Sequence, residues 1–279
     1  HAGLGTDTGG SCRIPAAFNG IVGFKPSQYR VPRDGAVPLS FSLDSVGPLA
    51  RSVQCCAALD SVLADEPATE LTARPVQGMR LAVPTTVALD DLEDAVAEAF
   101  ERALEHLARA GAVVERVAIP EFLDVAPMSA KGGFAAAESY AWHRYLIVAH
   151  GEVYDPRVRE RIMRGESQSA ADYVDLISAR KSLIARAAVR LAPYDALVMP
   201  TAAITPPTIA SLADDKAFTK ANLLSLRNCT LINMIDGCAI SLPCHREGEV
   251  PVGLMLAAVS GADRRIFELA AGMEALIRG

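Results

Sequence analysis

A strand, a long helix and a second strand follow one another between residues 79 and 117, and this order constrains the fold strongly. Residues 79–84 form an apolar run that ends in proline, which predicts a buried strand. From 90 to 110 apolar residues recur every three or four positions, and Gly111 then stands where a helix would end. Residues 112–117 return to a strand pattern. This order predicts a right-handed crossover between parallel strands.

The rest of the chain supports an α/β fold, with a mixed β-sheet core flanked by helices. Helical spacing covers residues 52–64, 134–149, 157–164, 171–191 and 263–277. The last helix is expected to face inward with Ile266, Leu269, Ala270, Met273, Leu276 and Ile277. Further strands are expected at 195–200, 238–243 and 252–257, the last two pairing across a turn at 246–249. Loops are expected at 1–48 (with short strands), 65–77 and 211–222. We expect a single unit over 1–279, with a helical cap at about 120–195.

Charge and cysteine content limit the classes of partner. The chain has 279 residues and a net charge of -6, with a pI near 5.4, so direct binding of nucleic acid or of an anionic membrane is not expected. A tRNA-carried substrate stays open, because a partner subunit could supply a basic surface. No apolar run is long enough for a membrane span, and no secretory signal is evident. The six cysteines lack metal-ligand spacing and predict free thiols in a cytoplasmic protein.

A glycine-rich loop near the start of the chain is the strongest functional signal. Its sequence is GTDTGGSCR, in which Ser11 follows Gly9 and Gly10. Glycines allow backbone N–H groups to approach a substrate carbonyl, and a serine there is placed to attack it. Spacing alone also permits a tight turn or a phosphate-binding loop, although the motif lacks the lysine of a P-loop and the dinucleotide pattern.

This loop resembles the central motif of the amidase signature family. Similar blocks follow in the same order at residues 19–27 (NGIVGFKPS), 43–53 (LDSVGPLARSV), 233–243 and 251–256. The resemblance implies a Ser–cis-Ser–Lys mechanism without a cofactor or metal. Ser11 would be the nucleophile, and Thr8, Gly9 and Gly10 would offer the N–H groups of the oxyanion hole. Asp7 would support the loop by accepting hydrogen bonds.

The sequence departs from the family in one respect. The family's bridging serine and catalytic lysine lie upstream of the nucleophile, where this sequence has no corresponding segment. We therefore expect the chain to be the C-terminal part of a longer protein. None of the lysines matches the catalytic position; Lys25, within the FKP block, is expected to have a structural or surface role, and the others are Lys131, Lys181, Lys216 and Lys220.

Other polar and aromatic residues have less specific interpretations. Arg13 is expected to hold the loop by pairing with a carboxylate, with contact to an acidic substrate as the alternative. Asp44 is expected to be structural, or else to line a pocket mouth. Four histidines (His106, His143, His150 and His245) are expected to be surface or packing residues. Tyr140, Trp142 and Tyr145 are expected in the core, with a pocket wall as the alternative.

The first functional hypothesis is hydrolysis of a small-molecule amide through a Ser11 acyl-enzyme, releasing ammonia or an amine. The alternatives are the A-type subunit of a tRNA-dependent amidotransferase and a fragment that is inactive without its missing N-terminal half. The acidic pI slightly favours the free-standing amidase. A homo-oligomer or a partner subunit is compatible with all three, and the substrate's identity is not encoded in a recognisable pattern.

Overall fold

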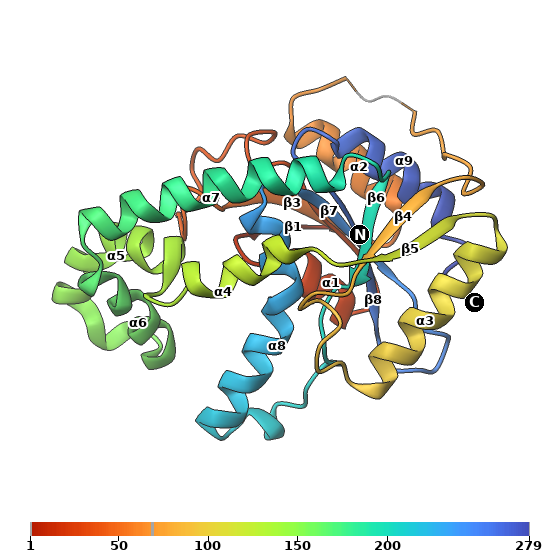
Figure 1. The fold of residues 1–279 in the computed structure, drawn as a ribbon. Coiled ribbons are helices and arrows are strands. Elements are labelled where there is room, and N and C mark those ends of the chain that lie inside the picture. Colours follow the sequence, from red (N-terminus) through yellow and green to blue (C-terminus); the bar gives the residue numbers. More distant parts are fainter. Residues whose placement is uncertain (1, 68–69, 279) are drawn as a thin grey trace.

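The computed structural model describes residues 2–67 and 70–278, and it is built on a mixed sheet (Figure 1). The strand order is β1-β3-β2-β7-β8-β6-β4-β5. The strands are β1 (Ala2–Asp7), β2 (Val22–Lys25), β3 (Ser45–Ala50), β4 (Arg80–Pro84), β5 (Val113–Val117), β6 (Ala196–Pro200), β7 (Cys238–Pro243) and β8 (Gly253–Ala258). This sheet confirms the predicted fold class.

Parallel pairing is confined to one end of the sheet. Strand β4 runs parallel to β5 and to β6, with Leu81 opposite Val114 on one side and Ala196 on the other. This confirms that the strand pattern at 79–117 joins two parallel neighbours through a helix. The remaining pairs are antiparallel, including the expected β7–β8 pair, in which Ser241 lies opposite Met255.

Helices cover both faces of the sheet (Figure 1). The α-helices are α1 (Arg13–Phe18), α2 (Val53–Leu63), α3 (Asp94–Arg109), α4 (Val125–Met128), α5 (Gly133–His150), α6 (Pro156–Met163), α7 (Ala170–Leu191), α8 (Asp215–Met234) and α9 (Asp263–Met273). The short 3-10 helices are η1 (Pro120–Asp124), η2 (Gly151–Val153), η3 (Arg164–Ser167) and η4 (Ala210–Leu212). One apolar cluster joins the sheet to α2, α3 and α9, and a second joins it to α1, α7 and α8. The result is three layers with a core on each side of the sheet.

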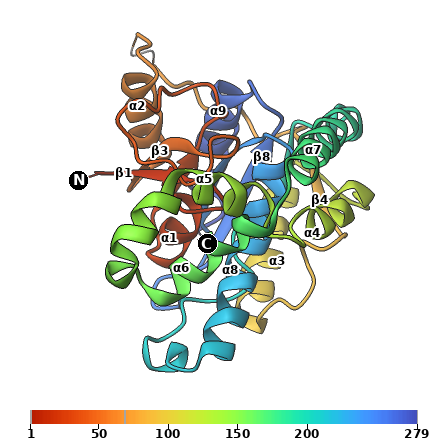
Figure 2. The same cartoon turned by 90° about the vertical axis from the view of Figure 1, so that its left-hand side faces the viewer.

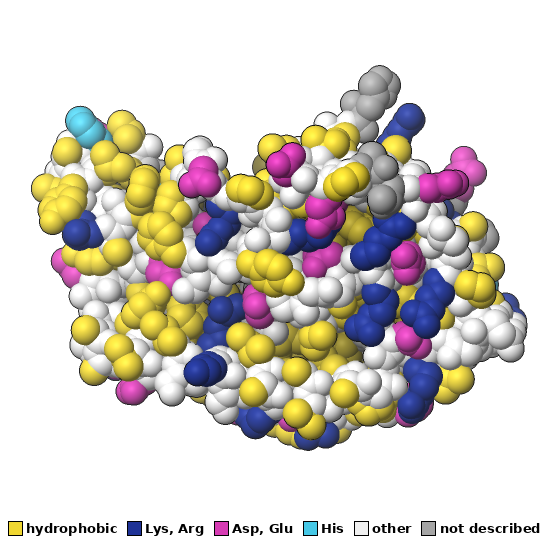
Figure 3. Space-filling view, turned by 90° about the horizontal axis from the view of Figure 1, so that it is seen from above, with side chains coloured by type: hydrophobic (Ala, Val, Ile, Leu, Met, Phe, Trp, Pro, Cys, Tyr) yellow, Lys and Arg dark blue, Asp and Glu magenta, His cyan; other side chains and the backbone are white. Residues whose placement is uncertain are grey.

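The helices between residues 120 and 191 extend away from the sheet (Figure 1), and Figure 2 shows α5 and α6 in front when the molecule is viewed from that end. Their far end carries exposed apolar side chains, and Figure 3 shows hydrophobic groups on that end of the molecule. Trp142 and Tyr145, on the outer half of α5, are 47% and 73% exposed. The expected core packing of these two aromatics is therefore wrong, because α5 continues beyond the sheet that would cover it.

Two helices were not expected from the sequence. Helix α1 lies where loops with short strands were predicted, and it follows Ser11 closely. Helix α8 begins inside the predicted loop at 211–222, with the Asp214 carboxylate accepting hydrogen bonds from Lys216 N and Ala217 N. The first half of α8 is largely solvent-facing, so it lacks the apolar stripe on which helix prediction depends.

The ends of two predicted helices also differ. Helix α3 begins at Asp94, four residues after the predicted start, while Gly111 follows its end with φ +96° as expected. Helix α9 ends at Met273, and Leu276, predicted to face inward, is 38% exposed. Ile277 is buried as predicted.

The cysteines are free thiols and, apart from exposed Cys55, buried. Cytoplasmic localisation stays a prediction. Among the described residues, no helix combines the length and the apolar character needed to cross a membrane. The linker expected at 65–77 forms neither helix nor strand where it is described, and residues 68–69 within it lie outside the described part.

Candidate active site

Ser11 lies in the turn between β1 and α1, and its side chain is exposed. We call residues 8–12 the Ser11 loop. Gly10 has φ +129°, a conformation that L side chains rarely adopt. A Cβ atom at Gly10 would lie 2.5 Å from Ile14 Cδ1 and 2.6 Å from Cys229 Cβ. The loop can therefore pack against α1 and α8 only with glycine at this position.

Replacing Gly10 with alanine is expected to lower the free energy of unfolding by about 2–4 kcal/mol, since backbone strain adds to overpacking. The matched control is Gly35→Ala, because Gly35 also has a positive φ of +85° but has open space around its Cβ position. Urea unfolding of both variants measures the difference. Equal losses in the two variants would show that Gly10 is not packed tightly against α1 and α8.

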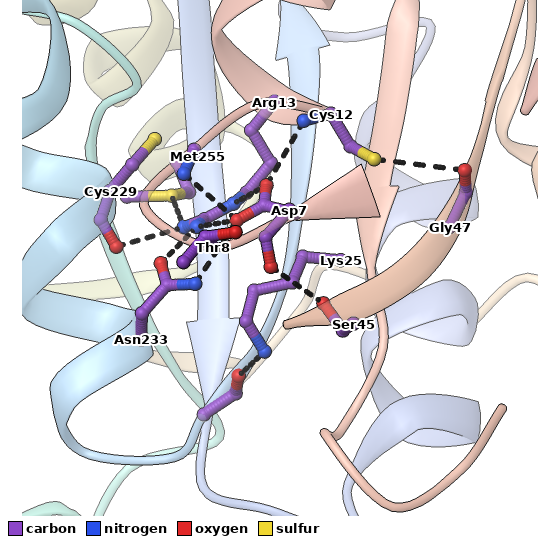
Figure 4. Close-up of polar contacts among 12 residues, drawn as sticks. Asp7, Thr8, Cys12, Arg13, Lys25, Ser45, Gly47, Cys229, Asn233 and Met255 are labelled. Atoms are coloured by element: carbon purple, nitrogen blue, oxygen red, sulfur yellow. Dashed lines mark hydrogen bonds and ion pairs between the residues drawn. The ribbon is translucent and has the colours of Figure 1, made fainter. Parts of the chain in front are cut away.

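The buried Asp7 carboxylate fixes the Ser11 loop by accepting hydrogen bonds from its backbone (Figure 4). Its Oδ1 accepts a hydrogen bond from Gly10 N at 2.8 Å, and its Oδ2 accepts one from Cys12 N at 3.1 Å. The Arg13 guanidinium donates to the same carboxylate through Nη2 at 2.9 Å and Nε at 3.1 Å. Both side chains are fully buried. Arg13 thus faces a carboxylate of its own chain, and the contact to an acidic substrate has no support in this geometry.

Burial alone would raise the pKa of Asp7, but the charge and hydrogen bonds of Arg13 outweigh it and hold that pKa well below its ordinary value. Asp7 is consequently an ionised acceptor over the ordinary pH range. The pKa of the neighbouring Cys12 thiol is raised by burial and by the charge of Asp7. Cys12 is therefore a buried, protonated thiol, unsuited to act as a nucleophile next to Ser11.

A second carboxylate holds the loop from the side. Thr8 is buried, and its Oγ1 donates a 2.5 Å hydrogen bond to Asp44 Oδ1. Asp44 Oδ2 accepts from Leu39 N and Ser40 N, each at 2.9 Å. Asp44 is therefore bonded within the chain in the structural manner expected.

The predicted oxyanion donors differ in their availability. The Gly10 N–H is already bonded to Asp7, so Gly10 is not a free donor in this structure. No hydrogen bond involves the N–H groups of Thr8 and Gly9 among residues 2–67 and 70–278. Of the three predicted donors, the N–H groups of Thr8 and Gly9 are therefore available to an oxyanion, whereas that of Gly10 is not.

Sequence reasoning missed Asn233, at the end of α8. Its Oδ1 accepts from Arg13 Nη2 at 2.5 Å, and its Nδ2 donates to Asp7 Oδ1 at 3.1 Å (Figure 4). Arg13 Nη1 also donates to Cys229 O at 3.3 Å. The block at 233–243 begins with this asparagine, so a signal existed, but the missed start of α8 obscured its connection to the Ser11 loop.

Lys25 is buried, and its Nζ donates to Pro26 O and Gly237 O, both at 2.8 Å. Burial and the positive charge of Arg13 lower its pKa. These contacts are with backbone carbonyl groups, which agrees with a structural role and excludes a surface one. The other lysines named above are exposed.

The histidines make contacts elsewhere. His106 bonds to Leu276 O, His143 to the Tyr154 hydroxyl, and His245 to the backbone of Val252. His150 is exposed. Within the described residues, no group of His, Cys, Asp or Glu side chains is arranged to hold a metal ion.

The family model for Amidase matches residues 1–267. This chain belongs to the amidase family. A 2-amino-5-chloromuconic acid deaminase of Comamonas testosteroni is 36% identical over 98% of the chain and 60% of that protein. The A-type subunit of the glutamyl-tRNA(Gln) amidotransferase of Thermotoga maritima is 29% identical over 98% of the chain and 64% of that protein. The chain thus spans about 60% of the length of these curated relatives.

Solved structures of the amidase family have the same fold. A crystal structure of an amidase superposes with a TM-score of 0.85 at 31% identity, covering 99% of this chain and 63% of that one. The crystal structure of the Thermotoga maritima amidotransferase chain superposes with a TM-score of 0.77 at 31% identity, covering 99% of this chain and 65% of that one.

A hollow of about 400 Å³ opens beside Ser11 in this amidase-family chain. Ser11, helix α1, the segment from Pro207 through η4 and residues 218–226 of α8 form its walls. It is lined by Ser11, Ile14, Pro15, Phe18, Pro207, Leu212, Phe218, Ala221, Asn222, Ser225 and Leu226. None of these described residues carries a charge. The hollow therefore offers apolar contact with a few neutral polar groups next to the exposed hydroxyl.

Proposed function

We propose that this chain carries the nucleophile of an amidase, with Ser11 attacking the carbonyl carbon of a carboxamide. The observation that supports this most strongly is the exposed Ser11 hydroxyl on a loop pinned by two buried carboxylates, Asp7 and Asp44. A loop held in this way keeps the nucleophile in one orientation. Fixing the orientation of a reacting group is one of the ways in which enzymes raise the reaction rate. Membership of the amidase family supports the same reaction.

In the proposed reaction, Ser11 Oγ forms a bond to the carbonyl carbon while its proton passes to a base. The carbonyl π electrons move onto oxygen, giving a tetrahedral oxyanion. When the C=O bond re-forms, the C–N bond breaks, and the nitrogen leaves as ammonia or an amine after accepting the proton. Water then hydrolyses the ester on Ser11 to a carboxylate, which regenerates the hydroxyl.

We assign the oxyanion donors to the N–H groups of Thr8 and Gly9, because Gly10 N is bonded to Asp7. The Thr8 side chain is fixed by Asp44, so the orientation of its peptide group is restrained as well. Donors that are already oriented need not reorganise when charge develops on the carbonyl oxygen.

The proton acceptor is proposed to be a lysine acting through a bridging serine, both outside these 279 residues, as the family resemblance implies. Within the chain, Lys25 Nζ is bonded to two backbone carbonyl groups. The other lysines noted above are exposed on the surface.

Trapping the acyl-enzyme tests the proposal directly. The gene product in its native length is mixed with a carboxamide that releases ammonia, quenched in acid during turnover and digested with a protease. We expect the peptide that contains Ser11 to gain the mass of the acyl group. An acyl group on another residue, or hydrolysis without any adduct on a slow substrate, would contradict the assignment of Ser11.

A second candidate is the A-type subunit of a tRNA-dependent amidotransferase, favoured by the similarity to the Thermotoga maritima protein. The test is transfer of glutamine-derived ammonia to a charged acceptor tRNA in the presence of a co-purifying subunit. Hydrolysis of simple amides without any partner would count against this function. Assembly with a partner subunit or with a second copy stays a prediction.

We further propose that the hollow beside Ser11 binds an apolar part of the substrate. Filling it by Ala221→Phe is expected to raise KM about tenfold for an amide with an aromatic group, since contacts of about one to two kcal/mol would be lost. Acetamide, which does not fill the hollow, should be affected less than about threefold by the same variant. The control is Leu223→Phe, at an exposed position of α8 outside the hollow. Equal effects on both amides would show that the hollow is not a substrate site.

A further inference from the structure

The buried carboxylate of Glu138, on α5, lies outside the Ser11 loop and the hollow beside it. It is 5% exposed, and it accepts four hydrogen bonds. Oε2 accepts from Ser40 Oγ and from Ser42 N, the latter at 3.0 Å. Oε1 accepts from Ser42 Oγ and from the Tyr173 hydroxyl of α7, each at 2.5 Å. A carboxylate can accept about four hydrogen bonds, so these four donors fill the acceptor capacity of Glu138.

Three of these four bonds come from one loop, residues 39–44, which precedes β3. The other end of the same loop is held by Asp44, whose Oδ2 accepts from Leu39 N and Ser40 N. Ser40 is shared between the two carboxylates, since its N–H bonds to Asp44 and its hydroxyl to Glu138. Asp44 Oδ1 in turn accepts from Thr8 Oγ1 in the Ser11 loop. A continuous path of hydrogen bonds therefore joins α5 to the Ser11 loop.

Around Ser40 the loop depends on these bonds for its conformation. Leu43, near the end of the loop, is buried in the apolar core. Leu39 and Phe41 are 46% and 50% exposed, so burial of their side chains contributes little to fixing the part of the loop around Ser40. Arg33 and Arg180 add hydrogen bonds to the carbonyl groups of Phe41 and Ser42, respectively. Carboxylate acceptors make stronger hydrogen bonds than neutral ones, and both carboxylates meet at Ser40.

We propose that Glu138 is a positioning residue for the Ser11 reaction: through Ser40 and Asp44 it fixes Thr8, one of the two donors assigned to the oxyanion. This proposal rests on the proposed function. It gives the helices at 120–191 a part in the chemistry, because Glu138 belongs to α5 and not to the sheet. A displacement of about 1 Å in a donor can lower a rate about 100-fold, so the coupling does not require contact between Glu138 and substrate.

The test compares Glu138→Ala with Tyr173→Phe in the gene product of native length. Both variants remove the hydrogen bond between α5 and α7, but only Glu138→Ala also releases Ser40 and Ser42. We expect Glu138→Ala to lower kcat about 10- to 100-fold with KM changed less than about threefold, and Tyr173→Phe to keep kcat within about threefold. Glu138→Gln, which retains one acceptor oxygen, should restore part of the lost kcat. Glu166→Ala, which removes an exposed carboxylate bonded to Tyr140, should leave both constants unchanged.

Hydrogen exchange provides a readout that needs no activity. In Glu138→Ala, the Gly10 and Cys12 amides of the Ser11 loop, which are bonded to Asp7, should exchange about tenfold faster, while those of the central strand β8 keep their wild-type rates. Faster exchange throughout the protein would indicate general destabilisation and overturn the proposal, as would a kcat within about twofold of wild type. If the wild-type protein hydrolyses no amide, the proposed function fails, whereas the exchange measurement still decides whether Glu138 and the Ser11 loop are coupled.

Discussion

Replacing Ser11 with alanine is expected to lower kcat for amide hydrolysis at least about 1000-fold, because no bond to the substrate carbonyl can then form. Substrate binding should change little, since the Ser11 side chain is exposed and its loss leaves the hollow in place. Stability should be unchanged as well, as the side chain lies on the surface. The measurement is ammonia release by the gene product of native length, with KM or an inhibitor constant as the measure of binding.

Ser61→Ala is the control for this variant. Ser61 lies on α2, against the opposite face of the sheet, and its hydroxyl donates to Ala57 O within that helix. It should keep wild-type kinetics.

Loss of any one histidine should also leave most of the activity, because the contacts found for His106, His143 and His245 are not with the Ser11 loop. A histidine variant as inactive as Ser11→Ala would point to a different base and refute the Ser–Ser–Lys assignment.

The sheet was largely predictable because buried strands carry their own signal. The apolar runs that became β4, β6, β7 and β8 are bounded by proline, glycine or charged residues, and the amphipathic spacing of α3 fixed the crossover between β4 and β5. Helix α8 was not predictable in this way. Its first half lines the hollow beside Ser11 and faces solvent, so periodicity is absent there even though Asp214 caps it.

The site was predictable only in part, because some of its contacts join residues that are far apart in the sequence. The motif around Ser11 gave the loop and its local support from Asp7 and Arg13, which are close in sequence. The contacts that complete the support come from far along the chain: Asn233 reaches Arg13 across 220 positions, and Glu138 reaches Ser40 across 98. Glu138 lies in no pattern that indicates its contact, because a lone polar residue on a helix is ordinarily exposed. The block that begins with Asn233 marks this asparagine but does not indicate which residue it contacts.

Breaking the ion pair between Asp7 and Arg13 is expected to destabilise the protein strongly. Both side chains are fully buried at a distance of 2.9 Å. Removing one partner leaves the other charge without compensation in a dry site, which typically costs about 3–5 kcal/mol. Arg13→Ala should lower the free energy of unfolding by this amount in urea titrations. Glu101→Gln breaks an exposed ion pair to Arg116 and should cost less than about 1 kcal/mol.

The pH dependence gives an independent check on the same pair. Because the pKa of Asp7 is lower in the folded protein than in the unfolded chain, its contribution is present above the unfolded pKa of about 4 and is lost as pH falls toward the folded value. Wild-type stability should therefore decline below about pH 4, and Asp7→Asn should remove this part of the decline. An identical acid profile in the two proteins would contradict the lowered pKa.

The two partners should differ in their effect on activity. Asp7 accepts hydrogen bonds from Gly10 N and Cys12 N as well as from Arg13, so its loss releases the Ser11 loop directly. Arg13 acts on the loop through Asp7 and through contacts to α8 and β8. At equal fractions folded, Asp7→Ala should therefore lower kcat about tenfold more than Arg13→Ala, because two N–H anchors are lost with the carboxylate. Equal losses of kcat would mean that the ion pair, and not the anchoring of Gly10 and Cys12, is what holds Ser11 in place.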